Sequence, residues 1–201
     1  MDGGQSNLDG GGSNSRAGFV LTGGRSSRMG RDKALLDVGG TTLVGQIAGH
    51  VCEAAGSVTL VGGAGRYESL GYAILSDVVE NAGPMGGLLT VLRLAARKSS
   101  GAEWNLVVAC DMPSVTAGFL RGLLDAAEAS GAGCVVPETS EGLHPLCAVY
   151  HRRLLPAVER AIDHKILKMR DFLKNIGAEP WPVADGRLLR NINTPAEWTA
   201  R

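Results

Sequence analysis

The chain has 201 residues, and its 20 basic and 20 acidic side chains cancel to a formal net charge of zero. A balanced charge creates no global field that would attract nucleic acid or a membrane surface, so any anion-binding site must be local. Aromatic residues make up only 4% of the chain, which leaves little for stacking on single strands. No apolar run approaches the ~20 residues of a membrane-spanning helix. We therefore expect neither nucleic acid nor a membrane among the partners.

The N-terminal residues 1–16 are rich in glycine, serine and asparagine, and they lack the apolar middle of a signal peptide. This composition predicts a disordered arm. Residues 17–201 are expected to form a single domain. The cysteines lie far apart, with none in a CxxC pair, so we expect buried, reduced thiols in a cytoplasmic protein. They are Cys52, Cys110, Cys134 and Cys147.

Strand and helix signals alternate along the rest of the chain. In chain order, the pattern predicts a strand at 18–22, a helix at 41–56, strands at 57–62 and 72–77, a helix at 84–98, a strand at 104–111, a helix at 116–130, strands at 132–138 and 146–150, helices at 152–162 and 168–176, an edge strand at 179–183, and a loop then a helix within 191–200. Thr41 or Thr42 is expected to cap the first helix, and Pro156 to lie in the first turn of its own. The alternation predicts an α/β fold, a Rossmann-like three-layer sandwich with a mostly parallel central sheet.

A basic, glycine-rich segment, LTGGRSSRMGRDK, leaves the carboxyl end of the first strand, where ligands bind in open parallel sheets. Glycines let backbone N–H groups approach an anion closely, and basic side chains neutralise phosphate charge. Neither the Walker A nor the dinucleotide glycine spacing is met, because Met29 stands where the second Walker glycine is required. The segment predicts a triphosphate site, with a solvated loop as the alternative. Its cations are Arg25, Arg28, Arg31 and Lys33.

Two carboxylates follow predicted strands. Asp111 ends the apolar run LVVACD, and carboxylates at such positions commonly hold Mg²⁺. A helix cap or a buried ion-pair partner is the alternative for Asp111. Asp77 precedes the turn GPMGG at 83–87, which opens a helix whose N-terminus favours negative groups. A plain connection between strand and helix is the alternative there.

The segments LTGGRSSRMGRDKALL, SDVVENAGPMGGL and VVACDMP together resemble nucleotidyltransferases that attach a nucleotide to a phosphorylated acceptor, and in particular the MobA-type molybdenum cofactor guanylyltransferases. HPLCAVY, KMRDFL and NINTPAEW are similar to the same subgroup, so the resemblance covers about residues 18–198. It implies a fold of the nucleotide-diphospho-sugar transferase type, GTP and Mg²⁺ as ligands, and a molybdopterin-type acceptor. Molybdoenzyme maturation proteins are candidate partners.

The resemblance also implies roles for particular residues. Lys33 would contact the phosphates, Asp77 would bind the nucleotide, and Asp111 would hold Mg²⁺. His144 lies in a segment that the family places near the acceptor, although a histidine in a surface turn is an equal alternative. The nucleotide would lie along Leu21, Thr22, Gly23 and Gly24, and the acceptor side would include Asn191 and Asn193. The chain departs from the family where it reads VGGAGRY after the second strand, a place where relatives often carry an asparagine.

The expected reaction joins an acceptor phosphate to the α-phosphorus of GTP and releases pyrophosphate. A phosphate monoester is already largely dianionic near pH 7, so it needs no strong general base. Mg²⁺, Lys33, and Arg25 or Arg28 would stabilise the charge that develops in the transition state. A cytidylyltransferase using CTP on the same acceptor, or another nucleotidyltransferase, is the nearest alternative. A non-catalytic nucleotide-binding module, which would bind GTP without releasing pyrophosphate, is an alternative of another class.

Overall fold

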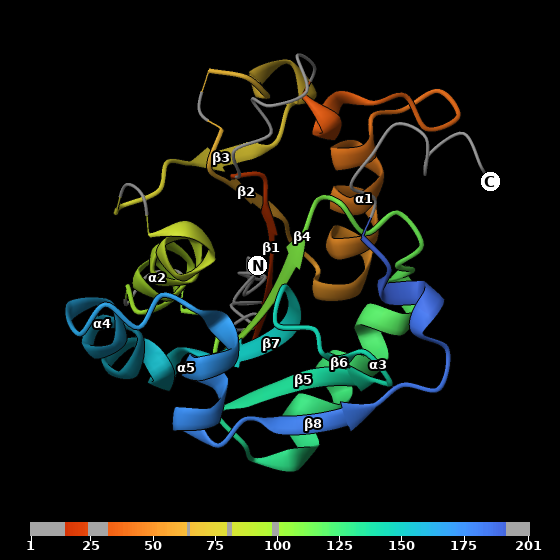
Figure 1. The fold of residues 1–201 in the computed structure, drawn as a ribbon. Helices are drawn as coiled ribbons and strands as arrows, with labels where there is room; N and C mark the ends of the chain where they lie inside the picture. The colour runs from red at the N-terminus through yellow and green to blue at the C-terminus, as the bar shows by residue number, and fades with distance from the viewer. Residues whose placement is uncertain (1–14, 24–31, 64, 80–81, 98–100, 192–201) are drawn as a thin grey trace, which may run out of the picture.

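The computed structural model describes residues 15–23, 32–63, 65–79, 82–97 and 101–191, and an eight-stranded sheet runs through its middle (Figure 1). The strand order is β3-β2-β1-β4-β7-β5-β6, with β8 paired to β5. The strands are β1 (Arg16–Leu21), β2 (Thr59–Val61), β3 (Ala73–Leu75), β4 (Trp104–Ala109), β5 (Cys134–Thr139), β6 (Gly142–Leu143), β7 (Cys147–His151) and β8 (Glu179–Pro182). From β3 to β4 all neighbours are parallel, as are β5 and β8. The prediction of a mostly parallel sheet is confirmed.

Five α-helices match the predicted helices, with bounds that differ from the expected ranges by up to three residues. They are α1 (Leu43–Ala55), α2 (Gly83–Ala95), α3 (Ala117–Ser130), α4 (Leu155–Asp163) and α5 (Met169–Ile176). Thr42 is the residue that caps α1, because its side chain accepts a hydrogen bond from the Gly45 amide. Pro156 lies in the first turn of α4, where its missing N–H costs nothing. None of the helices in the described segments is long and apolar enough to cross a membrane.

The helices cover both faces of the sheet, which gives the predicted three layers (Figure 1). Successive side chains of β1 point to opposite faces. Val20 packs into a core with α1 and α3, whereas Phe19 and Leu21 pack into a second core with α2, α4 and α5. The continuous apolar runs read from the sequence are therefore strands that are buried on both faces.

The strand β7 runs antiparallel to both of its neighbours, β4 and β5. A parallel pair needs a crossover of a dozen or more residues. Only the short β6 and its turns separate β5 from β7, so the chain returns as a hairpin. β8 pairs only with β5 among the described strands, in agreement with the expected edge strand.

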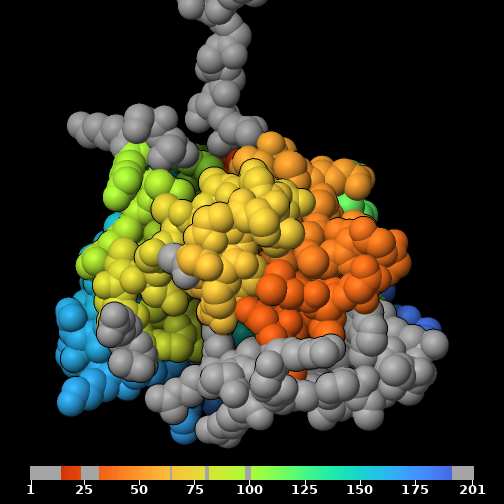
Figure 2. Space-filling model, turned by 90° about the horizontal axis from the view of Figure 1, so that it is seen from above, coloured from red at the N-terminus to blue at the C-terminus, as the bar shows by residue number. Residues whose placement is uncertain are grey.

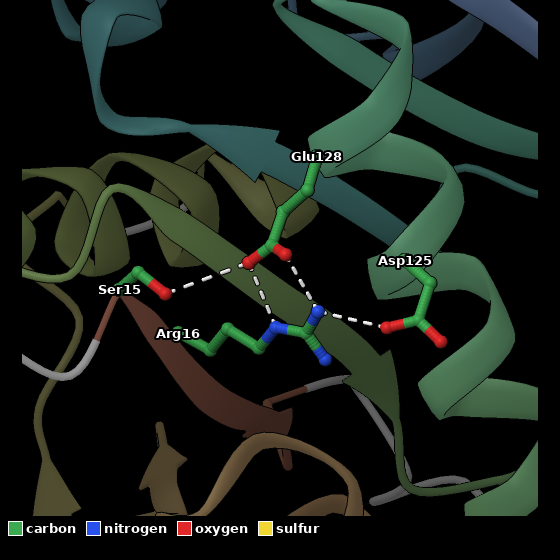
Figure 3. A network of polar contacts seen from close by, with 4 residues as sticks. All are labelled: Ser15, Arg16, Asp125 and Glu128. Atoms are coloured by element: carbon green, nitrogen blue, oxygen red, sulfur yellow. Dashed lines mark hydrogen bonds and ion pairs between the residues drawn. The ribbon is translucent and has the colours of Figure 1, made fainter.

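The folded part of the chain begins earlier than the expected arm of residues 1–16 allows. β1 starts at Arg16, whose guanidinium pairs with Asp125 and Glu128 of α3, while the Ser15 hydroxyl also contacts Glu128 (Figure 3). Residues 1–14, which make up the rest of the expected arm, lie outside the described residues.

Two other expectations are corrected. The strand expected at 104–111 ends at Ala109, so Asp111 lies in the turn that follows β4. Cys52 is exposed on α1 rather than buried, whereas Cys134 and Cys147 are buried as expected. All four thiols are unpaired with one another. The helix expected within 191–200 lies almost wholly outside the described residues.

Candidate active site

The strand order reverses at β1, because the chain adds β2 and β3 on one side of β1 and then returns to add β4 on the other. β1 pairs with β2 on one side and with β4 on the other, both in parallel. Ligands of open α/β sheets bind outside the strand ends at such a switch point. Thr22 and Gly23 directly follow β1, Asp77 follows β3 by two residues, and Asp111 follows β4 by two residues. The structure thus brings these four predicted residues to one edge.

Three glycines enclose the carboxylate of Asp77, and we call Gly23, Gly62 and Gly87 the glycine cradle. A Cβ on Gly23 would lie 3.3 Å from Asp77 Oδ2, and one on Gly62 would lie 3.0 Å from the Gly23 amide nitrogen. A Cβ on Gly87 would lie 3.8 Å from Asp77 Oδ1 and only 3.0 Å from Leu21 Cδ2. Any side chain at these positions would fill the space beside the carboxylate. Asp77 itself is exposed, yet its partial enclosure raises its pKa above the usual aspartate value.

Leu21 and Thr22 lie beneath this cradle rather than open to it. The Leu21 side chain is buried in the sheet core, and its carbonyl oxygen accepts a hydrogen bond from the Cys110 amide at 3.2 Å. The Thr22 hydroxyl donates toward the carbonyl oxygens of Val61 and Gly62, each 3.0 Å away, and its amide donates to Val61 at 2.9 Å. These contacts fix the end of β1 against β2. Of the predicted nucleotide contacts that the structure describes, Gly23 and Asp77 are exposed.

Asp111 carries a buried oxygen that the described residues do not satisfy. Its Oδ1 is shielded from solvent and has no hydrogen-bond partner among the described residues. Burial raises the pKa of this carboxyl, and the positive charge of nearby Lys33 opposes the rise only in part. A buried, unpaired carboxylate oxygen is costly unless a cation or a donor completes it.

The environment of Asp111 fits a magnesium ion. Mg²⁺ is usually held by one or two carboxylates together with substrate phosphates and water. The described residues contain no group of three or more histidine, cysteine, aspartate or glutamate side chains suited to a metal. The Asp111 carboxylate at the switch point suits an ion whose remaining ligands are nucleotide phosphates and water.

Lys33 begins the 3₁₀-helix η2 (Lys33–Leu35), which follows the glycine-rich segment. Asp32 caps this turn by accepting a hydrogen bond from the Ala34 amide at 3.1 Å. The positive charge of Lys33 lowers the pKa of Asp111, in opposition to the effect of burial. The other predicted phosphate contacts, Gly24, Arg25, Arg28 and Arg31, lie outside the described residues.

A cavity of about 430 Å³ brings together the predicted acceptor residues His144 and Asn191. Its lining also includes Arg170, Arg190 and Met112, the residue after Asp111, so the cavity adjoins the magnesium candidate. The third predicted acceptor residue, Asn193, lies outside the described residues.

His144 is held firmly in this cavity. Its Nε2 lies 2.8 Å from the Thr139 hydroxyl, and its amide donates to Pro137 at 2.9 Å. Burial lowers the pKa of His144, and the nearby Arg170 lowers it further, while Glu141 acts in the opposite direction. The imidazole is therefore neutral near pH 7. This arrangement suits a hydrogen-bonding contact rather than a charged one.

Sequence motifs alone do not assign a role to several residues at this edge. The sequence leaves open whether Arg170 meets an acidic acceptor or lies on a solvated helix face, and the structure places it in the cavity lining together with Arg190. The signal for Arg170 in the sequence is its position on α5, next to Met169 and Phe172, which belong to the buried face of that helix. Tyr67 packs fully buried after β2 and donates a hydrogen bond to Asp32, and no local pattern in the sequence links these two residues.

Comparison with known proteins agrees with this geometry. A family model described as the MobA-like NTP transferase domain matches residues 18–180. A probable molybdenum cofactor guanylyltransferase of Pelotomaculum thermopropionicum is 32% identical, over 90% of this chain and 88% of that protein. A probable molybdenum cofactor guanylyltransferase of Flavobacterium johnsoniae is 29% identical, over 89% of this chain and 92% of that protein.

Among solved structures, the molybdopterin-guanine dinucleotide biosynthesis protein A of Archaeoglobus fulgidus shares the fold, with a TM-score of 0.76 and 23% identity over 92% of this chain and 95% of that one. The fold and the matched sequence agree on one classification. The chain belongs to the MobA-like NTP transferase family and is an enzyme of the nucleotidyltransferase class.

Proposed function

We propose that the protein transfers GMP from GTP to the phosphate of a molybdopterin-type acceptor and releases pyrophosphate. The names of its relatives support the choice of GTP and of molybdopterin. Cytoplasmic location and molybdoenzyme maturation proteins as partners stay predictions.

The observation that carries the proposal is the unpaired Oδ1 of Asp111. It lies after β4 at the switch point, near the charge of Lys33, and Met112 next to it lines the acceptor cavity. A group between nucleotide and acceptor is where transfer must take place. Magnesium held by Asp111 would neutralise phosphate charge and so reduce the repulsion between the two anions.

The chain's own residues would also contribute, because they would position the substrates and supply positive charge. Lys33 would hold the phosphates, and Arg25 and Arg28 stay proposed as further phosphate contacts, each worth roughly 10²–10³ in rate by analogy with other donors to developing charge. Arg170 and Arg190 give the cavity two fixed positive charges that suit an anionic acceptor. An acceptor phosphate needs no deprotonation by the protein near pH 7, in keeping with a neutral His144.

The glycine cradle gives a physical basis for choosing guanine. Guanine presents two donors, N1–H and the 2-amino group, which a carboxylate accepts together, whereas the pairing edge of cytosine presents a donor beside an acceptor. Asp77 is the carboxylate that the cradle leaves accessible. Sites that hydrogen-bond a base edge discriminate well, since a mismatched base leaves polar groups unpaired. Backbone carbonyls near Gly62 are the alternative acceptors.

The test is a pyrophosphate-release assay with each of the nucleoside triphosphates, Mg²⁺ and molybdopterin. We expect release with GTP only, and a larger thermal shift with GTP and Mg²⁺ than with CTP and Mg²⁺. Release that prefers CTP would identify a cytidylyltransferase instead. GTP binding without pyrophosphate release in the presence of acceptor would identify a non-catalytic nucleotide-binding module.

A further inference from the structure

Asp32 joins η2 to the segment that carries Arg66 and Tyr67. Its Oδ1 accepts from the Ala34 amide at 3.1 Å and so caps η2, the turn that begins with Lys33. Its Oδ2 accepts from the Tyr67 hydroxyl at 2.7 Å and from Arg66 Nη1 at 3.2 Å. The direction in which η2 leaves Asp32 therefore depends on what holds the Asp32 carboxylate.

Of these contacts, the one from Tyr67 is the better protected. Tyr67 is fully buried, and the side chain of Asp32 is 17% exposed. The Arg66 side chain is 47% exposed, so water and salt screen its ion pair. A hydrogen bond from a buried phenol to a carboxylate is both stronger and more directional.

Tyr67 is fixed by the same turn that builds the glycine cradle. Gly63 follows Gly62 and adopts a φ of +68°. A Cβ on Gly63 would lie 2.2 Å from Tyr67 Cε2 and 3.1 Å from the Thr22 hydroxyl, so the ring packs directly on the backbone there. Figure 2 shows the segment after β2 (yellow) lying against the segment that begins with Asp32 (orange).

A purely structural tyrosine would serve equally well as phenylalanine, because the core needs only its ring. Here the hydroxyl is directed at a carboxylate that caps the turn of Lys33. Burying a phenol is unfavourable unless the hydroxyl is hydrogen-bonded, so its presence calls for this partner. The pKa of Tyr67 is raised, first by burial and then by the hydrogen bond to Asp32, which keeps the hydroxyl protonated as a donor.

We propose that Tyr67 is a positioning residue, whose hydroxyl holds Asp32 and thereby sets the place of Lys33 relative to the glycine cradle. The proposal rests on the proposed function, in which Lys33 stabilises phosphate charge during transfer. Tyr67 does not touch the nucleotide in this proposal, and it acts through Asp32 and η2. It gives a role to the segment VGGAGRY, in which the chain departs from the asparagine expected after the second strand.

The expected effect is on turnover more than on binding. Small misplacement of a catalytic group can lower a rate by up to about 10²-fold, and we expect Tyr67→Phe to lower kcat by about 10-fold or more. The dissociation constant for GTP should stay within about threefold, because a slightly displaced Lys33 would still contact the phosphates but would stabilise the charge of the transition state less well.

The experiment compares Tyr67→Phe with Tyr72→Phe, a partly buried tyrosine of the same segment that does not contact Asp32. GTP affinity, melting temperature and steady-state pyrophosphate release are measured for both and for the wild type, and Tyr67→Phe is repeated in a Lys33→Met background. A fall in kcat specific to Tyr67→Phe, with GTP affinity and melting temperature kept, and a smaller fall in the Lys33→Met background support the proposal.

Three results would overturn it. They are an unchanged kcat in Tyr67→Phe, a loss that follows a lower melting temperature, and a loss of the same size with and without Lys33. If the wild type and Tyr72→Phe release no pyrophosphate with GTP and acceptor, the proposed function fails and this role of Tyr67 fails with it. If they are active and Tyr67→Phe is equally active, only the role of Tyr67 fails.

Discussion

Replacing Arg16 by methionine tests how the first strand is held to α3. Arg16 Nε donates to Glu128 Oε1 at 2.8 Å, and Nη2 donates to Glu128 Oε2 at 2.6 Å and to Asp125 Oδ1 at 2.8 Å (Figure 3). The Arg16 side chain is 24% exposed and that of Glu128 is 33% exposed, so this two-pronged pair is partly shielded. Methionine keeps the apolar stem and removes only the guanidinium.

We expect Arg16→Met to lower the free energy of unfolding by about 1–2 kcal/mol near pH 7. This loss exceeds the usual contribution of an exposed ion pair, because the contact is bidentate and partly buried. Urea denaturation followed by circular dichroism measures it. Arg121→Met is the matched control. Arg121 Nη2 makes a 3.2 Å ion pair with the Glu53 carboxylate and a 3.4 Å contact to its backbone carbonyl, and the two side chains are 48% and 63% exposed. The control should lose less than about 0.5 kcal/mol.

The pH dependence gives the sharper check. The hydrogen bond from Arg16 lowers the pKa of Glu128 in the folded state. The resulting stability is therefore present above the unfolded value of about 4.3 and is lost as the pH falls through the lower, folded-state pKa. The difference between wild type and Arg16→Met should narrow when denaturation is repeated at about pH 3.5. Equal losses of unfolding free energy in Arg16→Met and Arg121→Met near pH 7 would refute this reasoning. A difference between the wild type and Arg16→Met that persists undiminished in acid would refute it as well.

Three further predictions concern the active-site edge. Asp111→Asn should lower pyrophosphate release by about 10²-fold or more. The melting temperature should be kept or raised, because the change removes a buried carboxylate charge whose Oδ1 has no hydrogen-bond partner among the described residues. Undiminished release would contradict the magnesium role. Gly63→Ala should lower the unfolding free energy by about 1–3 kcal/mol, because the added Cβ would clash with the Tyr67 ring. Gly65→Ala is the control with a smaller expected loss, because Gly65 has the same left-handed backbone but its Cβ would meet no neighbour. Equal losses in the two variants would contradict the contact with Tyr67. His144 has a lowered pKa in the folded state, so stability should fall as the pH drops below about 6.5, and melting curves of His144→Gln should show a weaker fall; an identical fall would show that other groups cause it.

Most of the fold could be predicted because local patterns and tertiary burial agree. The run FVL in β1 sends Phe19 and Leu21 to one core and Val20 to the other, so an unbroken apolar run is what a central parallel strand requires. Local chemistry predicts the start of α1 from the Thr42 cap and the start of α4 from Pro156 in its first turn. The direction of β7 depends instead on the length of the connection before it, which periodicity does not report.

The active-site edge could be predicted only where one segment carries the signal. Asp77 and Asp111 follow apolar strands, and the fold brings them to one edge because parallel strands end together. Leu21 belongs to the glycine-rich motif LTGGRSSRMGRDK, yet its side chain is buried in the hydrophobic core. The contact between Asp32 and Tyr67 joins residues 35 positions apart, and neither position has a chemical signature by itself.

The two ends of the candidate site come from separate stretches of the chain, and the antiparallel strand β7 lies within the later stretch. The glycine cradle comes from segments up to α2, whereas the acceptor cavity is lined mainly by residues from Glu141 onward. Mutations in the later stretch can therefore reshape the acceptor cavity and leave the nucleotide end untouched. Under the proposed function, a duplicated copy of such a gene can acquire a new acceptor step by step while the residues proposed to bind the triphosphate stay unchanged.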